Sequence, residues 1–277
     1  MDEAERERID AALQEWRQGD CALGEMWLFS RIAPAAPLTQ EASTAADEGV
    51  DIAETEVSGF MVATQTCDIV RACGDRPFVE VCPLVGVDAG QLQHVQRGRF
   101  PRYAFVPALI DRMLVADLDR VMTVEKAVLA EWARISGSNS DEEARRLSLS
   151  LARKRARVAF PDDFVELTAA LSDRLSGKHG KNSDEGRALR GLREIRVQAA
   201  PSWNADEVDL FFWFIRNEDE PTFEDKSWDQ YLDGWMARVP PSGRFNSIGG
   251  VVVTLEDLTA QEYVESDPLD LDHLSLR

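Results

Sequence analysis

The stretch that decides the fold is Gly59 to Val85, which reads G-F-M-V-A-T-Q-T-C-D-I-V-R-A-C-G-D-R-P-F-V-E-V-C-P-L-V and holds three of the four cysteines. Two apolar runs, Phe60 to Ala63 and Phe78 to Val85, flank a polar segment. Short runs rich in Val and Phe, separated by Gly and Pro, predict two buried strands and their connection. The polar segment Thr64–Asp68, here called the tip, lies where the first strand ends. Functional side chains often lie at such positions, so we expect the functional site there.

Length and composition bound the class of protein. The chain has 277 residues, of which 44% are hydrophobic, enough for one large domain or two ordinary ones. No uninterrupted apolar run reaches the roughly 18 residues of a membrane span. The first eight residues are highly charged and lack the apolar core of a secretory signal, so we expect a cytoplasmic protein with reduced cysteines and no membrane partner.

The charge is unevenly distributed. The net charge is −19, which disfavours nucleic-acid binding by the chain as a whole. Between Arg145 and Arg196, however, 13 basic and 7 acidic residues give a net of +6. These cations either form helix faces that pair with acidic neighbours or make a contact surface for an acidic partner or a nucleic acid. The second interpretation rests on Arg153, Lys154, Arg155, Arg157, Lys178 and Lys181.

The N-terminal half reads as rich in strands. A helical stripe from Ile9 to Trp16 precedes a first strand at Met26 to Phe29. Pro34 to Asp51, with four acids and few large apolar residues, predicts a long loop. Further strands are expected at Phe100 to Val106 and Met113 to Val124, with a short helix after them. Five or more strands with little helix between residues 20 and 125 predict a small barrel or sandwich.

The C-terminal half alternates helices and strands. Ser140 and Glu143 form a capping box that starts a helix, and Pro161 opens another with Phe164, Leu167, Leu171 and Leu175 on one face. Further elements are predicted as helices at 183–192 and 228–236 and strands at 194–199, 208–215 and 250–255. The fold class is therefore α+β: a β-rich N-terminal half (small SH3-like barrel or sandwich), a helical middle and a smaller α+β C-terminal unit. A break at Gly137 predicts domains 1–136 and 137–277, with a single intertwined domain as the alternative.

The layout of residues 19–87 resembles the MazF/PemK-type toxin barrel. The corresponding features are Gly19-Asp20 before the first strand, the loop from Pro34 to Asp51, and an apolar strand from Phe60 that ends at Thr64 or Thr66. The resemblance implies an SH3-like barrel over about a quarter of the chain. The Arg-Pro that the family places before its second strand is replaced by Ser58-Gly59, and the basic character of the family is absent. We therefore carry over the barrel shape and not the ribonuclease activity.

The cysteine spacing argues against a zinc knuckle. Cys67 and Cys73 are separated by five residues, and Cys73 and Cys82 by eight, whereas knuckles use C-x2–4-C. A site made of Cys67, Cys73, Cys82 and His94 requires long-range convergence. A core position for Cys82, which lies in an apolar strand, is the simpler interpretation. We expect no metal and no cofactor.

A catalytic thiol at the tip is a second hypothesis. Cys67 and Asp68 would act with His94, since His94 is the histidine best placed in the sequence to approach them. The adjacent Asp68 would raise the thiol pKa rather than lower it, which works against a nucleophile. The alternative is that Thr64, Thr66 and Asp68 hydrogen-bond to backbone groups and hold the turn.

These observations favour a non-enzymatic recognition or regulatory protein. It would bind a basic protein partner or a small ligand at the tip, through the ligand-binding residues Thr64, Gln65, Thr66, Arg71 and Arg76. A bacterial antitoxin-like or phage-defence accessory factor is one context that fits. Two alternatives stay open: a hydrolase or nuclease-like enzyme that uses Cys67 and Asp68, and nucleic-acid binding through the basic segment 145–196.

Overall fold

The contacts in the computed structural model divide the chain into two compact units, Met1–Ala156 and Arg157–Arg277. The structure describes residues 2–96, 100–156, 158–218, 223 and 226–269. The division falls after Ala156 rather than near Gly137. The reason is that Leu147, on the helix that follows Gly137, is buried in a hydrophobic cluster of the first unit.

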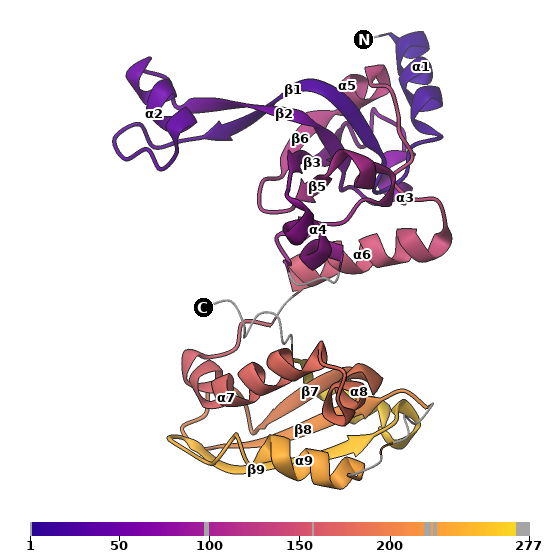
Figure 1. The fold of residues 1–277 in the computed structure, drawn as a ribbon. Helices are drawn as coiled ribbons and strands as arrows, with labels where there is room; N and C mark the ends of the chain where they lie inside the picture. Colours follow the sequence, from indigo (N-terminus) through magenta and orange to yellow (C-terminus); the bar gives the residue numbers. More distant parts are fainter. Residues whose placement is uncertain (1, 97–99, 157, 219–222, 224–225, 270–277) are drawn as a thin grey trace. The chain divides into compact units, whose positions relative to one another are not determined.

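The first unit is built on one antiparallel sheet (Figure 1). Its order is β1-β2-β3-β5-β4, with β6 also paired to β3. The pairings among the described residues form an open path and do not close into a barrel. The β-rich N-terminal half is thus confirmed. Of the two predicted architectures, barrel or sandwich, a closed barrel is not found in this part of the chain. The strands are β1 (Cys21–Arg31), β2 (Ile52–Val62), β3 (Phe78–Gly86), β4 (Tyr103–Ala104), β5 (Leu114–Asp117) and β6 (Met122–Glu125).

A proline explains why the predicted strand from Met113 to Val124 is split. The Lys126 N–H donates to the Pro77 carbonyl, and the Val87 N–H donates to the Met113 carbonyl, so these β3-side groups face β5 and β6. Backbone groups alternate along a strand, and Pro83 therefore faces the same side. Because proline has no N–H, the ladder is interrupted there, and residues 118–121 separate β5 from β6.

The helices of the first unit lie around this sheet. The predicted loop from Pro34 to Asp51 was wrong in part, because α2 occupies its middle and is capped by the Thr39 side chain, which accepts from Ala42 N. The strand expected at Phe100 to Val106 is reduced to the two residues of β4. The helices are α1 (Glu3–Leu13), α2 (Gln40–Asp47), α3 (Thr66–Ile69), α4 (Ala89–Gln96), the 3-10 helix η1 (Pro107–Arg112), α5 (Lys126–Glu131) and α6 (Asp141–Ala156).

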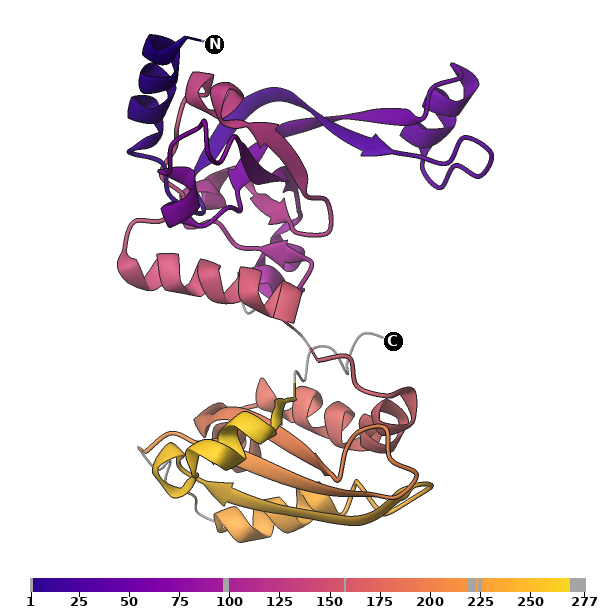
Figure 2. The same ribbon diagram turned by 180° about the vertical axis from the view of Figure 1, so that it is seen from behind.

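The β1–β2 ribbon leaves the sheet at Gly59. This residue has a φ of 141°, and a Cβ there would lie 2.1 Å from the Ala22 carbonyl oxygen. The β1–β2 register shifts between Leu23 and Met26, and the β2–β3 ladder ends at Phe60 and Pro83. Beyond this point the ribbon extends away from the rest of the first unit and carries α2 at its end (Figures 1 and 2). We call residues 26–57 the arm.

The second unit is a four-stranded sheet packed against helices. The order is β10-β7-β8-β9, with β8 and β9 parallel and the other pairs antiparallel. The predicted apolar strand at 208–215 is central, as expected, and its Phe212 and Phe214 are fully buried. No described helix of either unit has both the length and the apolar character needed to cross a membrane. The elements are α7 (Asp162–His179), α8 (Asp184–Gly191), β7 (Leu192–Ala200), β8 (Val208–Arg216), α9 (Trp228–Met236), β9 (Phe245–Val253), the 3-10 helix η2 (Leu255–Asp257), α10 (Ala260–Glu265) and β10 (Asp267–Pro268).

We predict that Gly59→Ala destabilises the first unit by more than about 2 kcal/mol, because the new Cβ would collide with a backbone carbonyl and the φ is unfavourable for an L-residue. Urea denaturation followed by circular dichroism would measure the loss. Gly86→Ala is the control, since Gly86 is also in a strand and a Cβ there would meet open space. Equal stability of the two variants would contradict the prediction.

Candidate functional site

The tip leads into a short helical turn, and its threonine hydroxyl groups bond to the backbone of two other segments. The Thr64 Oγ1 accepts from the Glu80 N–H at 2.6 Å, and the Thr66 Oγ1 accepts from the Gln18 N–H at 3.0 Å. The side chains of Gln65 and Cys67 remain exposed. The two threonines therefore fix the turn, as the structural alternative predicted, and the exposed groups of the tip are an amide and a thiol.

A buried lysine anchors the tip from below. Lys126 is fully buried, and its Nζ donates to the Asp68 carbonyl at 2.8 Å and to the Arg71 carbonyl at 2.6 Å. Burial lowers the pKa of this ammonium group. The sequence analysis missed Lys126, because a lysine at the start of a helix normally reads as a surface charge and nothing local signals its burial.

The structure does not bring the predicted catalytic residues together. The Cys67 thiol donates to Gln65 Oε1 at 3.7 Å, and Asp68 pairs with Arg71 at 3.5 Å. His94 lies on α4 with its ring 5.3 Å from that of Phe100. Among the described residues no hydrogen bond links Cys67 to a histidine or to another base, so the catalytic hypothesis gains no geometric support from them.

The cysteines do not form a cluster. Cys73 and Cys82 are buried and all four thiols are free. Burial raises the pKa of Cys82 to about 12, and it also raises the pKa values of Cys21 and Cys73. Over the described ranges, no group of three or more His, Cys, Asp or Glu side chains is arranged to hold a metal ion.

Part of the basic segment is engaged by acids of its own unit. Lys154 pairs with Asp119, and Arg155 Nη2 lies 2.6 Å from Glu80 Oε2. Arg153 lies on α6 with them, Arg157 falls outside the described residues, and Lys178 and Lys181 belong to the second unit. Arg71 pairs with Asp68, while Arg76 is exposed. These pairs match the interpretation of helix faces that meet acidic neighbours.

The arm exposes aromatic side chains. The sequence predicts a strand there but does not indicate whether these side chains face the core or the solvent. Trp27 is 44% exposed, Phe29 is 51% exposed and Leu38, in the turn before α2, is 95% exposed. In the register, Trp27 lies opposite Glu56, Phe29 opposite Glu54 and Arg31 opposite Ile52, so one face of the ribbon carries these six side chains. The other face holds the buried Leu28, Ala53 and Val57.

A groove of about 890 Å³ runs between α2 and the exposed face of the ribbon. We call it the arm groove. Its apolar lining comes from Trp27, Phe29, Pro34, Ala45, Val50 and Ile52, and its acidic lining from Glu41, Glu48, Asp51 and Glu54. From Glu25 to Glu56 the chain has seven acids and one base, and that base, Arg31, pairs with Asp51 at 2.8 Å. The sequence does contain a pattern that could have indicated this face, namely Trp27-x-Phe29 and Ile52-x-Glu54-x-Glu56. Alternation alone, however, does not show which face of a ribbon is exposed to solvent.

Comparison with known proteins gives no relative to reason from: no family model matches the chain, and neither a curated protein nor a solved structure was found to be similar to it.

We predict that Cys67 is the thiol of the native protein that iodoacetamide alkylates fastest, because it is exposed whereas the other three are buried and the burial raises their pKa values. Intact-mass spectrometry at neutral pH would follow the reaction. Cys67→Ser should abolish the fast phase, and unfolding in urea should make all four thiols reactive. Labelling of a second thiol at the same rate in the native protein would contradict this.

Proposed function

We propose that this protein is a non-enzymatic recognition protein that binds a basic, amphipathic segment of a protein partner in the arm groove. The observation that carries the proposal is the combination of exposed aromatic rings and four carboxylates along one groove, of which only Asp51 is paired with a base among the described residues. The composition predicts that this acidic protein binds a basic partner, and the arm groove is the surface that we propose for that contact.

The apolar side chains of the arm groove are exposed. Large apolar side chains grouped on the surface usually mark contact sites, and Trp and Tyr contribute disproportionately to binding energy. Trp27, Phe29 and Ile52 lie on one face of a ribbon that projects from its unit, which leaves that face accessible along the arm. A partner's apolar side chains would bury these rings and gain the free energy of removing them from water.

The charges of the arm groove select a basic partner. Four carboxylates line the arm groove, and Arg31 is already paired. Lys and Arg side chains at the rim would meet these acids, and their heads would also reach the faces of Trp27 and Phe29. A nucleic acid would be repelled by the same carboxylates. A basic amphipathic helix or strand satisfies both requirements.

The tip is the second candidate surface for the same recognition function. Its exposed Gln65 and Cys67 are presented on a turn fixed by Lys126, Thr64 and Thr66, and such preorganisation reduces the entropic cost of binding. Four acids and a groove favour the arm as the main contact. An antitoxin-like or phage-defence role stays a hypothesis of context.

We predict that Trp27→Ala weakens binding of an amphipathic leucine–lysine peptide to the full chain by about thirtyfold, the effect of losing one central aromatic anchor. Fluorescence anisotropy of a labelled peptide would measure it. Phe78→Ala is the matched control, because Phe78 is also a strongly exposed aromatic residue of the first unit but lies in β3 outside the arm. If both variants bind as tightly as the unchanged protein, the arm groove is not the site.

We predict that the double variant Glu48→Lys and Glu54→Lys binds this peptide about tenfold more weakly at low salt, and that the difference shrinks as salt screens the charges. Glu15→Lys is the control, since Glu15 is an exposed acid of the first unit away from the arm groove. An equal loss in the Glu15→Lys protein would mean that total charge, rather than this groove, attracts the peptide.

A further inference from the structure

The sheet of the second unit ends at β9, and no described strand pairs with the outer side of this strand (Figure 1). Residues 248–253 of β9 are all half-exposed, as expected for an edge strand. An edge strand presents a row of N–H and C=O groups that its own sheet does not pair. The outer side of β9 is therefore a template for another strand.

The hydrogen bonds of β8 show which groups of β9 are open. The Val208 N–H donates to the Arg244 carbonyl, so Val208 faces β9. By alternation Leu210, Phe212 and Phe214 face β9 as well. In a parallel ladder, a residue that bonds to the neighbouring strand lies opposite a residue that faces away from it. The residues of β9 that lie opposite these three, and therefore face outward, are Ile248, Gly250 and Val252.

The pairing on the far side of the sheet gives the same result. The Leu269 N–H donates to the Ile195 carbonyl, so Ile195 faces β10 and its neighbour Arg196 faces β8. Arg196 pairs with Trp213, which therefore faces β7 and leaves the next residue, Phe214, to face β9. In the described part of the chain, no group outside the sheet bonds to the outward backbone of β9 over residues 248–252.

β9 lacks the features that usually protect an edge strand. Its sequence, F-N-S-I-G-G-V-V-V, contains no charged residue and no proline. Its register shift lies at its start, opposite Val208 and Asp209, so the outward row after it is regular. β10, at the other edge of the sheet, is only two residues long and ends on Pro268. Because exposed edges are normally short, charged, bulged or interrupted by proline, β9 is typical of a strand that another strand covers.

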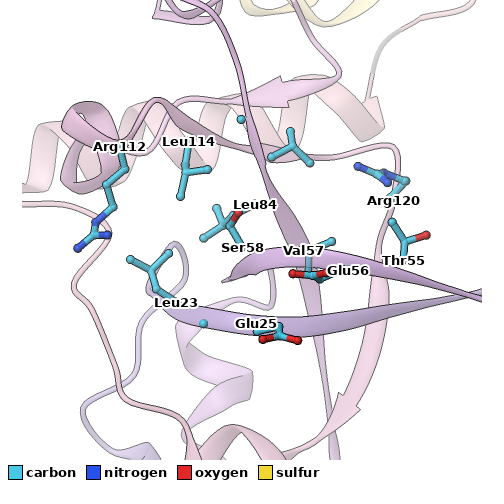
Figure 3. Close-up of a pocket in the computed structure, with 13 residues that line it drawn as sticks. Leu23, Glu25, Thr55, Glu56, Val57, Ser58, Leu84, Arg112, Leu114 and Arg120 are labelled. Atoms are coloured by element: carbon cyan, nitrogen blue, oxygen red, sulfur yellow. The ribbon is translucent and has the colours of Figure 1, made fainter.

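The first unit has no comparable edge beside its cavity. Figure 3 shows this cavity, which has a volume of about 660 Å³ and is lined in part by residues 84–86 of β3. β3 pairs with β2 up to Pro83 and with β5 from Leu84 to Gly86. The described residues thus leave no row of open backbone groups on β3, in contrast to β9.

A second copy of the chain matches the open row of β9. The outward residues are evenly spaced about Gly250, so a two-fold axis there places Gly250 opposite Gly250 of the second copy and Ile248 opposite Val252. Every outward residue then forms an antiparallel pair in which the two residues exchange both N–H···O bonds. An axis at Gly249 or Val251 would leave one outward residue of each strand without such a pair. The register centred on Gly250 therefore makes the most hydrogen bonds.

The side chains of β9 permit this approach. In the non-hydrogen-bonded pairs, where the Cα atoms come closest, Val251 would lie opposite Gly249 of the second copy, so no two large side chains meet there. On the other face of the sheet, Ile248 would lie opposite Val252. Both are half-exposed in the single chain and would be covered further by the pairing. The cross-strand contacts are thus apolar and free of steric conflict between bulky residues.

The absence of charge on β9 favours a second copy over a foreign strand. A foreign strand is usually selected by complementary charges or by pockets for its side chains. Pairing between identical strands needs neither, because the two-fold axis itself matches donors to acceptors. An uncharged strand also lets two molecules of net charge −19 meet without carboxylates opposite one another.

We propose that two copies of this chain associate by antiparallel pairing of their β9 strands about Gly250, which joins the two four-stranded sheets into one continuous sheet. This association goes beyond the proposed function, because it uses the second unit and pairs backbone groups rather than charges. Peptide binding in the arm groove does not depend on it.

The test uses the full-length ¹⁵N-labelled protein. Sedimentation equilibrium should show a monomer that converts to a dimer as the protein concentration rises. Where the dimer dominates, the amides of Ile248, Gly250 and Val252 should exchange with solvent as slowly as the amide of Val251, which bonds to β8. In protein diluted to the monomer, the three outward amides should exchange faster, while Val251 stays protected. NMR spectra recorded after the exchange is stopped would give the individual rates.

Val251→Lys places a charge next to the two-fold axis and should raise the Kd of the dimer at least about tenfold. Val264→Lys is the matched control and should leave the Kd unchanged, because Val264 is 80% exposed on α10 of the same unit. Slow exchange of the Phe214 amide, which faces β9, would show that the sheet of each variant is intact.

A monomer at every concentration whose outward amides exchange fast would overturn the proposal. Slow exchange of these amides in a monomer would also overturn it, since the chain would then cover its own edge. A dimer that leaves these amides open and tolerates Val251→Lys would place the contact elsewhere. If only an uncharged peptide, acetylated Thr-Val-Thr-Val amide, protects them, the occupant is a foreign strand and not a second copy. The leucine–lysine peptide tests the arm groove independently of all these results.

Discussion

The close crossing of β1 and β2 at Gly59 shapes the first unit. The absence of a side chain lets the β2 backbone approach the Ala22 carbonyl to a distance that any Cβ would prevent, and the positive φ redirects the strand there. The ribbon consequently diverges from β3 instead of extending the sheet. The arm, with the solvated face of its ribbon, results from this one constraint.

Buried polar groups keep the surrounding segments in place. Asp20 is buried, yet its carboxylate accepts from the Arg17 N–H at 2.8 Å, from Arg134 Nε at 2.6 Å and from the Gly137 N–H at 3.2 Å. Lys126 fixes the tip in a similar way, because its ammonium group donates to the carbonyls of Asp68 and Arg71. Each charge is tolerated because its hydrogen bonds are satisfied, and removal of one partner would leave the other group buried without compensation. Segments distant in sequence are thereby fixed relative to β1 and β2.

The sequence was most informative where a pattern is decided locally. The helical face of Phe164, Leu171 and Leu175 is buried, as its spacing predicted. The α+β class followed from such patterns. The sequence could not place α2 within the arm, since an alanine-rich segment with polar residues has the composition of both a loop and a short helix. It also could not assign faces to the ribbon, because alternation of Trp27 and Phe29 is the same whether they face a core or water. Lys126 shows a third limit, since its burial depends on the turn at Asp68, far away in sequence.

The net charge of −19 does not decide which surface of the protein attracts a ligand. At physiological ionic strength the screening length is about 8 Å, so a ligand responds mainly to the charges that line its own site. In the arm groove Asp51 neutralises the single arginine of the arm, which leaves Glu41, Glu48 and Glu54 to attract a cationic ligand. Elsewhere in the first unit the buried Asp117 holds Arg120 at 2.8 Å in the same way. Ion pairs within the fold, rather than composition, therefore decide which charges remain to attract a ligand.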